Sequence, residues 1–235
     1  TTVSNGLLSE LKKHSDRSFV LKNAIHPDIS TEYFEHHRRL QEPQSKFIIS
    51  YTGGLYGGRR DPSALFEVLS ILLKEGTIDR SDISIVYAGP DSEIWSEYLA
   101  KFDLSDIGVT HEMLSMKSSI EIQCKSSVNL LLTWATDEQK GILTGKFYEY
   151  LLAKRPILNL ISGIHDSEIE TLFSELDAGS IIYNDDHKLK IINIIQNYYS
   201  EWIENSYTQS KVSEENLTKN IWDDRINCLL QHIDE

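Results

Sequence analysis

A lysine and a glutamate lie three residues apart in segment 144–158, which reads TGKFYEYLLAKRPIL. Gly145 is expected to open a short helix, and this spacing places Lys146 and Glu149 on one face of it. The first amide groups of a helix lack intrahelical partners and attract anions, so Thr144 and Gly145 can offer backbone amides to phosphate. Lys146 can contact the same phosphate, and Glu149 can accept hydrogen bonds from two sugar hydroxyls. Together these groups suit a nucleotide-sugar site.

A second group of candidates follows the first expected strand, residues 47–51. Gly53 and Gly54 form a turn in which the backbone can approach a ligand, although a plain turn would have the same sequence. Arg59 and Arg60 come next, and a guanidinium is always charged and can bind a diphosphate through two parallel hydrogen bonds. We expect one arginine to contact the diphosphate and the other to face solvent. The alternative is an ion pair with Asp61.

The elements that must position these residues alternate along the chain. Apolar runs of strand length lie at 47–51, 83–88, 107–110, 128–133, 157–160 and 180–183. Helical patterns lie at 4–13, 61–75, 94–102, 118–125, 146–154, 167–176, 189–207 and 214–233. The alternation predicts an α/β fold with a Rossmann-like, doubly wound parallel sheet and helical N- and C-terminal extensions. Ligands in such sheets bind beyond the carboxyl ends of the strands, where the 53–54 turn, the 134–145 loop and the 162–163 turn fall.

The pattern divides the chain into three parts. Residues 1–44 are expected to hold a helix, a short strand and a connector, and residues 45–200 a nucleotide-sugar-binding domain. Residues 201–235 are expected to form a helical tail that packs toward a domain outside this chain. Because segment 32–44 is polar and charged, we expect a mobile connector there, with His36 and His37 solvated.

Composition excludes several classes of function. The net charge of −13 argues against binding of nucleic acid, which favours a basic face. Cys124 and Cys228 form no metal or disulfide framework, which indicates a reducing compartment and a cytoplasmic protein. There is no apolar run as long as the roughly 18 residues of a membrane span. No cluster has metal-ligand spacing, so we expect neither a metal nor another cofactor. Because the sequence lacks a starting methionine, we expect it to be part of a longer protein.

Segment 145–158 resembles the donor-site helix in the C-terminal half of a GT-B glycosyltransferase of family 4, and residues 51–54 resemble that family's phosphate-side loop. Residues 4–7 and 19–25 resemble the segments that flank its interdomain linker. The resemblance implies that Glu149 binds the ribose of a nucleotide-diphosphate sugar and that transfer retains the anomeric configuration. It also implies an N-terminal, acceptor-binding domain outside this chain. A glycan or lipid-linked acceptor would bind through that domain, as would any peripheral membrane association.

The chain departs from the family at one position. Members usually carry two glutamates in this motif; Glu149 matches the second, whereas the first falls at Gly141. Asp137 and Glu138 lie nearby but out of register. Two other interpretations therefore remain: a sugar-nucleotide epimerase or hydrolase of the same architecture, and a non-catalytic partner that supports a transferase. The residues assign no catalytic group.

Overall fold

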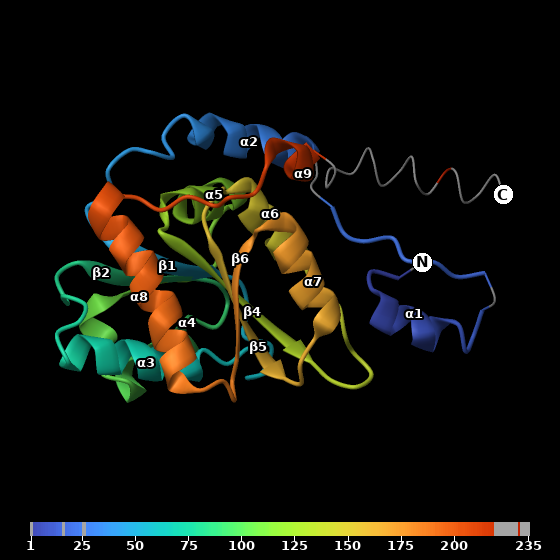
Figure 1. The fold of residues 1–235 in the computed structure, drawn as a ribbon, viewed down its shortest axis with the longest axis horizontal. Coiled ribbons are helices and arrows are strands. Elements are labelled where there is room, and N and C mark those ends of the chain that lie inside the picture. Colours follow the sequence, from blue (N-terminus) through green and yellow to red (C-terminus); the bar gives the residue numbers. More distant parts are fainter. Residues whose placement is uncertain (1, 16, 25–26, 219–229, 231–235) are drawn as a thin grey trace.

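The computed structural model describes residues 2–15, 17–24, 27–218 and 230. Their centre is a six-stranded sheet in the order β3-β2-β1-β4-β5-β6, in which every neighbouring pair is parallel (Figure 1). The predicted Rossmann-like sheet is thereby confirmed. The strands are β1 (Phe47–Thr52), β2 (Ile83–Ala88), β3 (Gly108–His111), β4 (Val128–Ala135), β5 (Ile157–Gly163) and β6 (Gly179–Tyr183).

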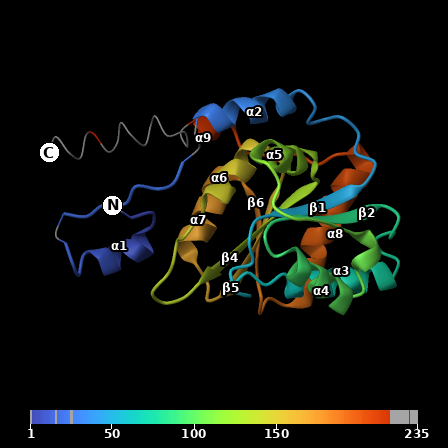
Figure 2. The same ribbon diagram turned by 180° about the vertical axis from the view of Figure 1, so that it is seen from behind.

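Helices cover both faces of the sheet (Figures 1 and 2). Side chains of α3, α4 and α8 pack in one core, and those of α2, α5, α6 and α7 pack in the other. The helices are α1 (Asn5–Leu11), α2 (Pro27–His37), α3 (Ser63–Lys74), α4 (Ser92–Lys101), α5 (Met116–Lys125), α6 (Gly145–Leu152), α7 (Ser167–Leu176), α8 (Lys188–Asn205) and α9 (Glu214–Thr218).

The two cores follow from the alternation of side chains along each strand. In β4, Leu130 and Leu132 face the core of α3, α4 and α8, whereas Leu131 between them faces the core of α6 and α7. Because both faces are covered, β4 reads as one continuous apolar run, as buried parallel strands do.

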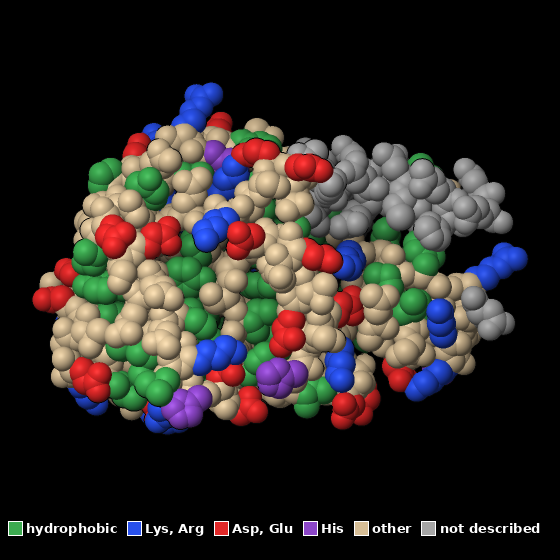
Figure 3. All heavy atoms as spheres, in the orientation of Figure 1, with side chains coloured by type: hydrophobic (Ala, Val, Ile, Leu, Met, Phe, Trp, Pro, Cys, Tyr) green, Lys and Arg blue, Asp and Glu red, His purple; other side chains and the backbone are tan. Residues whose placement is uncertain are grey.

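On the surface drawn in Figure 3, Lys and Arg side chains lie among Asp and Glu.

Capping residues decide where two helices begin. Pro62 takes the N-cap position of α3, and the Asp61 carboxylate accepts from the N–H of Ser63 at 2.8 Å, so this helix begins at Ser63, two residues after the start of the predicted range. The hydroxyl of Ser115 accepts from the N–H of Ser118 at 3.2 Å, and α5 therefore begins two residues earlier, at Met116.

The sheet is split between its two central strands. β1 and β4 pair at only two positions, the last at Ser50 and Asn129, whereas β4 and β5 pair at seven. Further along β1, the N–H of Thr52 donates to the hydroxyl of Tyr150 at 3.1 Å, and the Thr52 hydroxyl accepts from Gln123 Nε2 at 2.9 Å. Burial raises the pKa of Tyr150 well above its ordinary value of 10, so the phenol stays neutral. Side chains from α5 and α6 thus replace the missing strand pairing.

The prediction of a mobile connector at 32–44 was wrong for its first half. Residues up to His37 belong to α2, which packs on α5 and α6. Tyr33 is fully buried and its hydroxyl donates to the side chain of Gln123. His37 is half-buried rather than solvated, and its Nε2 lies 2.6 Å from the carbonyl oxygen of Leu152. These contacts of Tyr33 and His37 lie between α2 and the two helices on which it packs.

The described part of the C-terminal tail packs on the same domain. The predicted boundary at residue 200 falls inside α8, where Trp202 lies in the core. Arg155, 2% exposed, donates to the carbonyl of Thr208, whose hydroxyl donates to the carbonyl of Ser127. Burial lowers the pKa of Arg155 to about 10, so it remains charged at neutral pH. Leu217 is buried, and of the helical pattern predicted at 214–233 only residues 214–218 and 230 are described.

The described residues include no helix that is both long and apolar enough to cross a membrane.

The docking of α2 should be sensitive to acid. Burial lowers the pKa of His37 below its ordinary value of 6.5, so the unfolded chain binds the proton more readily than the folded one. Stability should therefore be fully present above pH 6.5 and decline as the pH falls from there through the lowered pKa. His37→Gln keeps a donor for the Leu152 carbonyl but does not titrate, so its urea midpoint should fall less on acidification. Equal declines in wild type, His37→Gln and the neighbouring control His36→Gln would contradict this.

Candidate functional site

The strand order reverses between β1 and β4, which makes their carboxyl ends the topological switch point of the sheet. Ligands of open α/β sheets bind in the crevice at such a point. Two loops form it: residues 53–62 after β1, and residues 136–144 after β4. Every candidate residue predicted from the sequence lies in one of these loops or in the α6 helix that follows the second.

The glycine turn after β1 is tightly packed. Gly53 has a φ of +154°, and a Cβ there would lie 3.2 Å from the hydroxyl of Tyr51. A Cβ on Gly54 would lie 3.3 Å from Asp91 Oδ2, which also accepts from the N–H of Leu55 at 2.6 Å. Packing of Gly53 against Tyr51, and of Gly54 against the loop after β2, accounts for both glycines, and their approach to a ligand stays a prediction.

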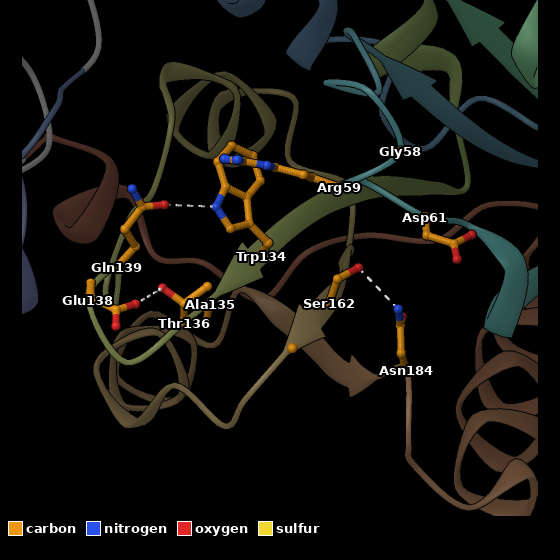
Figure 4. A pocket seen from close by; sticks show the side chains of 11 residues that line it. Gly58, Arg59, Asp61, Trp134, Ala135, Thr136, Glu138, Gln139, Ser162 and Asn184 are labelled. Carbon is orange, nitrogen blue, oxygen red and sulfur yellow. Dashed lines mark hydrogen bonds between the residues drawn. The ribbon is translucent and has the colours of Figure 1, made fainter.

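The structure separates the two arginines. Arg60 does not face solvent: it is 5% exposed, and its Nη1 donates to the Tyr51 hydroxyl at 3.2 Å and the Gly54 carbonyl at 3.1 Å. Its guanidinium also lies 4.2 Å from the ring centre of Tyr56. Arg59 is exposed, and its guanidinium lies 5.7 Å from the ring centre of Trp134 (Figure 4). Arg60 therefore supports the loop, and Arg59 is the arginine available to a ligand.

Neither arginine forms an ion pair with Asp61 in the described part of the chain, so the alternative interpretation of this segment does not hold. The Asp61 carboxylate instead accepts from the N–H of Ser63 at the start of α3.

A pocket of about 510 Å³ opens beside Arg59 at the carboxyl ends of β4, β5 and β6 (Figure 4). The indole N–H of Trp134 donates to Gln139 Oε1 at 3.1 Å, which fixes the plane of the ring. Across the pocket, Asn184 Nδ2 donates to the hydroxyl of Ser162 at 3.1 Å. The lining residues are Gly58, Arg59, Asp61, Trp134, Ala135, Thr136, Glu138, Gln139, Ser162, Gly163 and Asn184.

Sequence reasoning found this pocket only in part. It identified Arg59, the 134–145 loop and the 162–163 turn, and the structure shows that Trp134, at the start of that loop, lines the pocket. It missed Asn184. The available signal was its position directly after β6, because polar side chains after neighbouring parallel strands meet at one edge of the sheet.

Lys146 and Glu149 lie together, as their spacing predicted. Lys146 Nζ donates to Glu149 Oε2 at 2.7 Å, and Gln123 Nε2 approaches the same oxygen at 3.4 Å. The two charged side chains are 31% and 28% exposed, respectively. Within the described residues Glu149 Oε1 accepts no hydrogen bond. The carboxylate is thus held in place by one oxygen while the other can accept from a ligand.

The N-terminus of α6 has the predicted form. Thr144 is the N-cap residue, but its side chain makes no capping hydrogen bond, and its buried Oγ1 has no partner among the described residues. Gly145, the first helical residue, is exposed, and a Cβ there would meet nothing within 4 Å. Open space therefore adjoins the first turn of α6, whose free amide groups attract anions.

Gly141 stands where the resemblance places a first glutamate, and the structure fills the space that a side chain would need. Its φ is +70°, and a Cβ would lie 2.2 Å from Glu168 Oε2 and 2.9 Å from the Cβ of Ser4. The N–H of Gly141 donates to Asp166 Oδ2 at 2.6 Å, while Glu168 accepts from the N–H of Asn5 at 3.1 Å. Residues at the start of α7 therefore bind both this loop and the N-terminal segment.

The described residues contain no cluster of three or more His, Cys, Asp or Glu side chains placed to hold a metal ion.

No model of a known protein family matches this chain, and no curated protein matches its sequence. Solved structures do match its fold. WaaG, described as a glycosyltransferase involved in lipopolysaccharide biosynthesis, is 13% identical with a TM-score of 0.60, covering 95% of this chain and 60% of WaaG. A TarM mutant from S. aureus, solved with fondaparinux, α-GlcNAc-glycerol and UDP, is 11% identical with a TM-score of 0.65. The match covers 100% of this chain and 43% of TarM. A protein from Listeria monocytogenes assigned as a UDP-N-acetylglucosamine 2-epimerase is 15% identical with a TM-score of 0.54. The match covers 95% of this chain and 55% of the Listeria protein.

This chain has the Rossmann-like fold of the C-terminal half of a GT-B glycosyltransferase, which confirms the fold that the resemblance implied. At these identities the likeness establishes fold alone. The chain spans between 43% and 60% of the lengths of the three structures.

The two arginines should respond oppositely to truncation. Arg60→Ala removes a buried guanidinium together with its two hydrogen bonds. It should lower the free energy of unfolding by about 2–4 kcal/mol. Arg59→Ala changes an exposed side chain and should stay within about 0.5 kcal/mol of wild type. Urea unfolding of both variants measures the difference. Equal losses would show that the loop does not depend on Arg60.

Gly141 should tolerate a methyl group only after Glu168 is shortened. Gly141→Ala introduces left-handed strain of about 1–2 kcal/mol and a contact with Glu168. Since Glu168→Ala removes that contact, the two changes together should cost less than the sum of their separate costs. Gly145→Ala is the matched control, because open space surrounds its Cβ position. Additive costs in the double-mutant cycle would contradict the packing described above.

Proposed function

We propose that this chain is the donor-binding part of a glycosyltransferase that takes a sugar from a nucleotide-diphosphate sugar. The observation that carries the proposal is the half-buried Glu149 carboxylate, held by Lys146 and Gln123 with one oxygen left to accept, one turn from an open helix N-terminus. A carboxylate of this kind suits the two hydroxyls of a ribose. The adjoining helix N-terminus suits the diphosphate.

The same groups would assist departure of the nucleotide diphosphate. Negative charge grows on the leaving phosphate as the bond to the sugar breaks, and donors already aimed at that charge lower the barrier. Arg59 and the first amides of α6 are such donors. Lys146 can join them by releasing Glu149, because both side chains remain about one-third exposed. This contribution would increase when a second domain closes over the cleft and excludes water.

The acceptor would bind elsewhere in the complete protein. Since the chain spans about half the length of the structures that share its fold, we infer that a second Rossmann-like domain completes the enzyme. A glycan or lipid-linked acceptor would bind there, together with the group that directs its attack, and transfer would retain the anomeric configuration. We expect the protein to act in the cytoplasm, with any membrane association peripheral and through that second domain.

Two alternatives each rest on one observation. The fold shared with the Listeria protein favours an epimerase or hydrolase acting on a sugar nucleotide. Product analysis on the complete protein separates this from transfer. The closed space at Gly141 favours a partner without activity that supports a transferase. Absence of UDP and GDP binding to the complete protein would favour that role.

Glu149→Gln should weaken nucleotide binding by roughly ten-fold or more, because a hydrogen bond to a charged group contributes about 1.5–3 kcal/mol. A deoxyribose nucleotide should bind the wild type more weakly but lose nothing further on the variant, since both changes remove one interaction. Calorimetry on the complete protein with UDP and GDP gives the affinities.

Glu97→Gln is the matched control, since Glu97 is exposed on α4, a helix of the opposite core. If Glu149→Gln binds nucleotide as tightly as this control, Glu149 is a surface residue of the helix and not part of a ribose site.

A further inference from the structure

The pocket beside Arg59 has no part in the nucleotide contacts proposed above, apart from Arg59 at its rim. It lies at the ends of β4, β5 and β6, while Lys146 and Glu149 lie with Gln123 on the face covered by α5 and α6. Its volume of about 510 Å³ is ample for one small ring and falls in the range of roughly 300–1,000 Å³ found for ligand pockets. Its lining indicates which ring.

One wall is a fixed aromatic face. The indole of Trp134 is half-buried, and its hydrogen bond to Gln139 holds the plane of the ring before any ligand arrives. The Arg59 guanidinium lies over the indole, 5.7 Å from its ring centre, and the ring centre of Tyr56 lies 5.8 Å away. Because this hydrogen bond already restrains the ring, stacking against it costs less side-chain entropy.

Two further lining residues supply acceptors for hydroxyl groups: Glu138 beside Gln139, and Asn184 on the other side of the pocket (Figure 4). Glu138 Oε2 accepts from the hydroxyl of Thr136 at 3.0 Å, which holds this carboxylate and leaves Oε1 without a partner in the described residues. Asn184 donates to Ser162 and keeps its carbonyl oxygen likewise unpaired within the described residues. An aromatic face with one acceptor on its own side of the pocket and one on the other matches a ring that has an apolar side and a rim of hydroxyls.

The charges of the pocket indicate a neutral ligand. Glu138 and Asp61 supply two carboxylates, whereas Arg59 is the single cation among the described lining residues and is stacked on Trp134 at the rim. An anionic ligand group placed among these two carboxylates would be repelled, while hydroxyl groups would be favoured. A uronic acid therefore fits less well than the corresponding hexose.

We propose that this pocket binds the ring of a neutral pyranose, stacked on Trp134 with its hydroxyls donating to Glu138 and Asn184. The proposal deepens the proposed function and rests on it for the molecule that carries the ring. That ring is either the sugar of the nucleotide donor or the terminal residue of a glycan acceptor, and the two present the same chemistry to these side chains.

The test follows the indole N–H resonance of Trp134 in the complete protein, assigned with Trp134→Phe. Methyl glycosides of glucose, galactose, mannose and N-acetylglucosamine are titrated first, and then UDP, GDP and the nucleotide sugars of the same four rings. A shift with a free glycoside identifies a glycan ligand. A shift with a nucleotide sugar that exceeds the shift with the bare nucleotide identifies the donor sugar. Either result supports the pocket.

Two comparisons decide whether the named side chains hold the ring. Glu138→Gln should weaken binding of the best ring by roughly ten-fold, as expected for a hydrogen bond to a charged acceptor, whereas Glu97→Gln should not. The uronic acid counterpart should bind the wild type more weakly than the neutral sugar, and Glu138→Gln should narrow that difference. Circular dichroism of each variant checks that it is folded.

The proposal is overturned if no ring of either series shifts the Trp134 resonance, if Glu138→Gln binds like Glu97→Gln, or if the uronic acid binds as tightly as the neutral sugar. These failures remain distinct from failure of the proposed function. UDP or GDP binding that depends on Glu149 can be present while every ring leaves Trp134 unchanged.

Discussion

The site depends on the split between β1 and β4. Two neighbouring parallel strands would ordinarily continue their ladder to the end, but these two stop pairing after Ser50 and Asn129. A buried N–H without a partner would cost about 1–3 kcal/mol, so another acceptor must be supplied. Tyr150 supplies it, and Gln123 binds the adjacent Thr52 hydroxyl. Because Gln123 also reaches Glu149, the repair of the sheet and the placement of the candidate ribose carboxylate are one hydrogen-bond network.

A second network fixes the loop between β4 and α6 from outside the sheet. Asp166 caps α7 and accepts from the N–H of Gly141, while the hydroxyl of Ser4 donates to the carbonyl of Lys140 at 2.7 Å. The side chain of Asn23 donates to the carbonyl of Leu143 at 2.9 Å. The N-terminal segment therefore holds the loop at two points, and Figure 1 shows α1 beside α7 at this edge. That loop carries Thr136, Glu138 and Gln139 of the pocket and ends at the first amides of α6.

The sheet could be predicted because each strand is an apolar run bounded by turn residues. Strands that are buried on both faces of a parallel sheet have this pattern. Helix α2 could not be predicted, because its outer side is charged and its buried contacts come from Tyr33 and His37, two residue types that are equally common on surfaces. Nor could the sequence distinguish Arg59 from Arg60, since the buried position depends on where the loop turns after Gly54. The contact between Lys146 and Glu149 was predictable from helical spacing alone. Gln123, which also donates to Glu149, lies on a different helix, so spacing along the sequence did not indicate it.

The packing around Gly141 also limits how this chain can change over evolutionary time. A glutamate at this position is one substitution away in sequence, yet its Cβ would enter space held by Glu168 and Ser4. Glu168 in turn binds Asn5, so relieving the overlap would loosen the N-terminal segment. A carboxylate at 141 therefore requires earlier changes at two distant places in the chain, each with its own cost in stability. The glycine is held by epistasis as well as by its own backbone conformation.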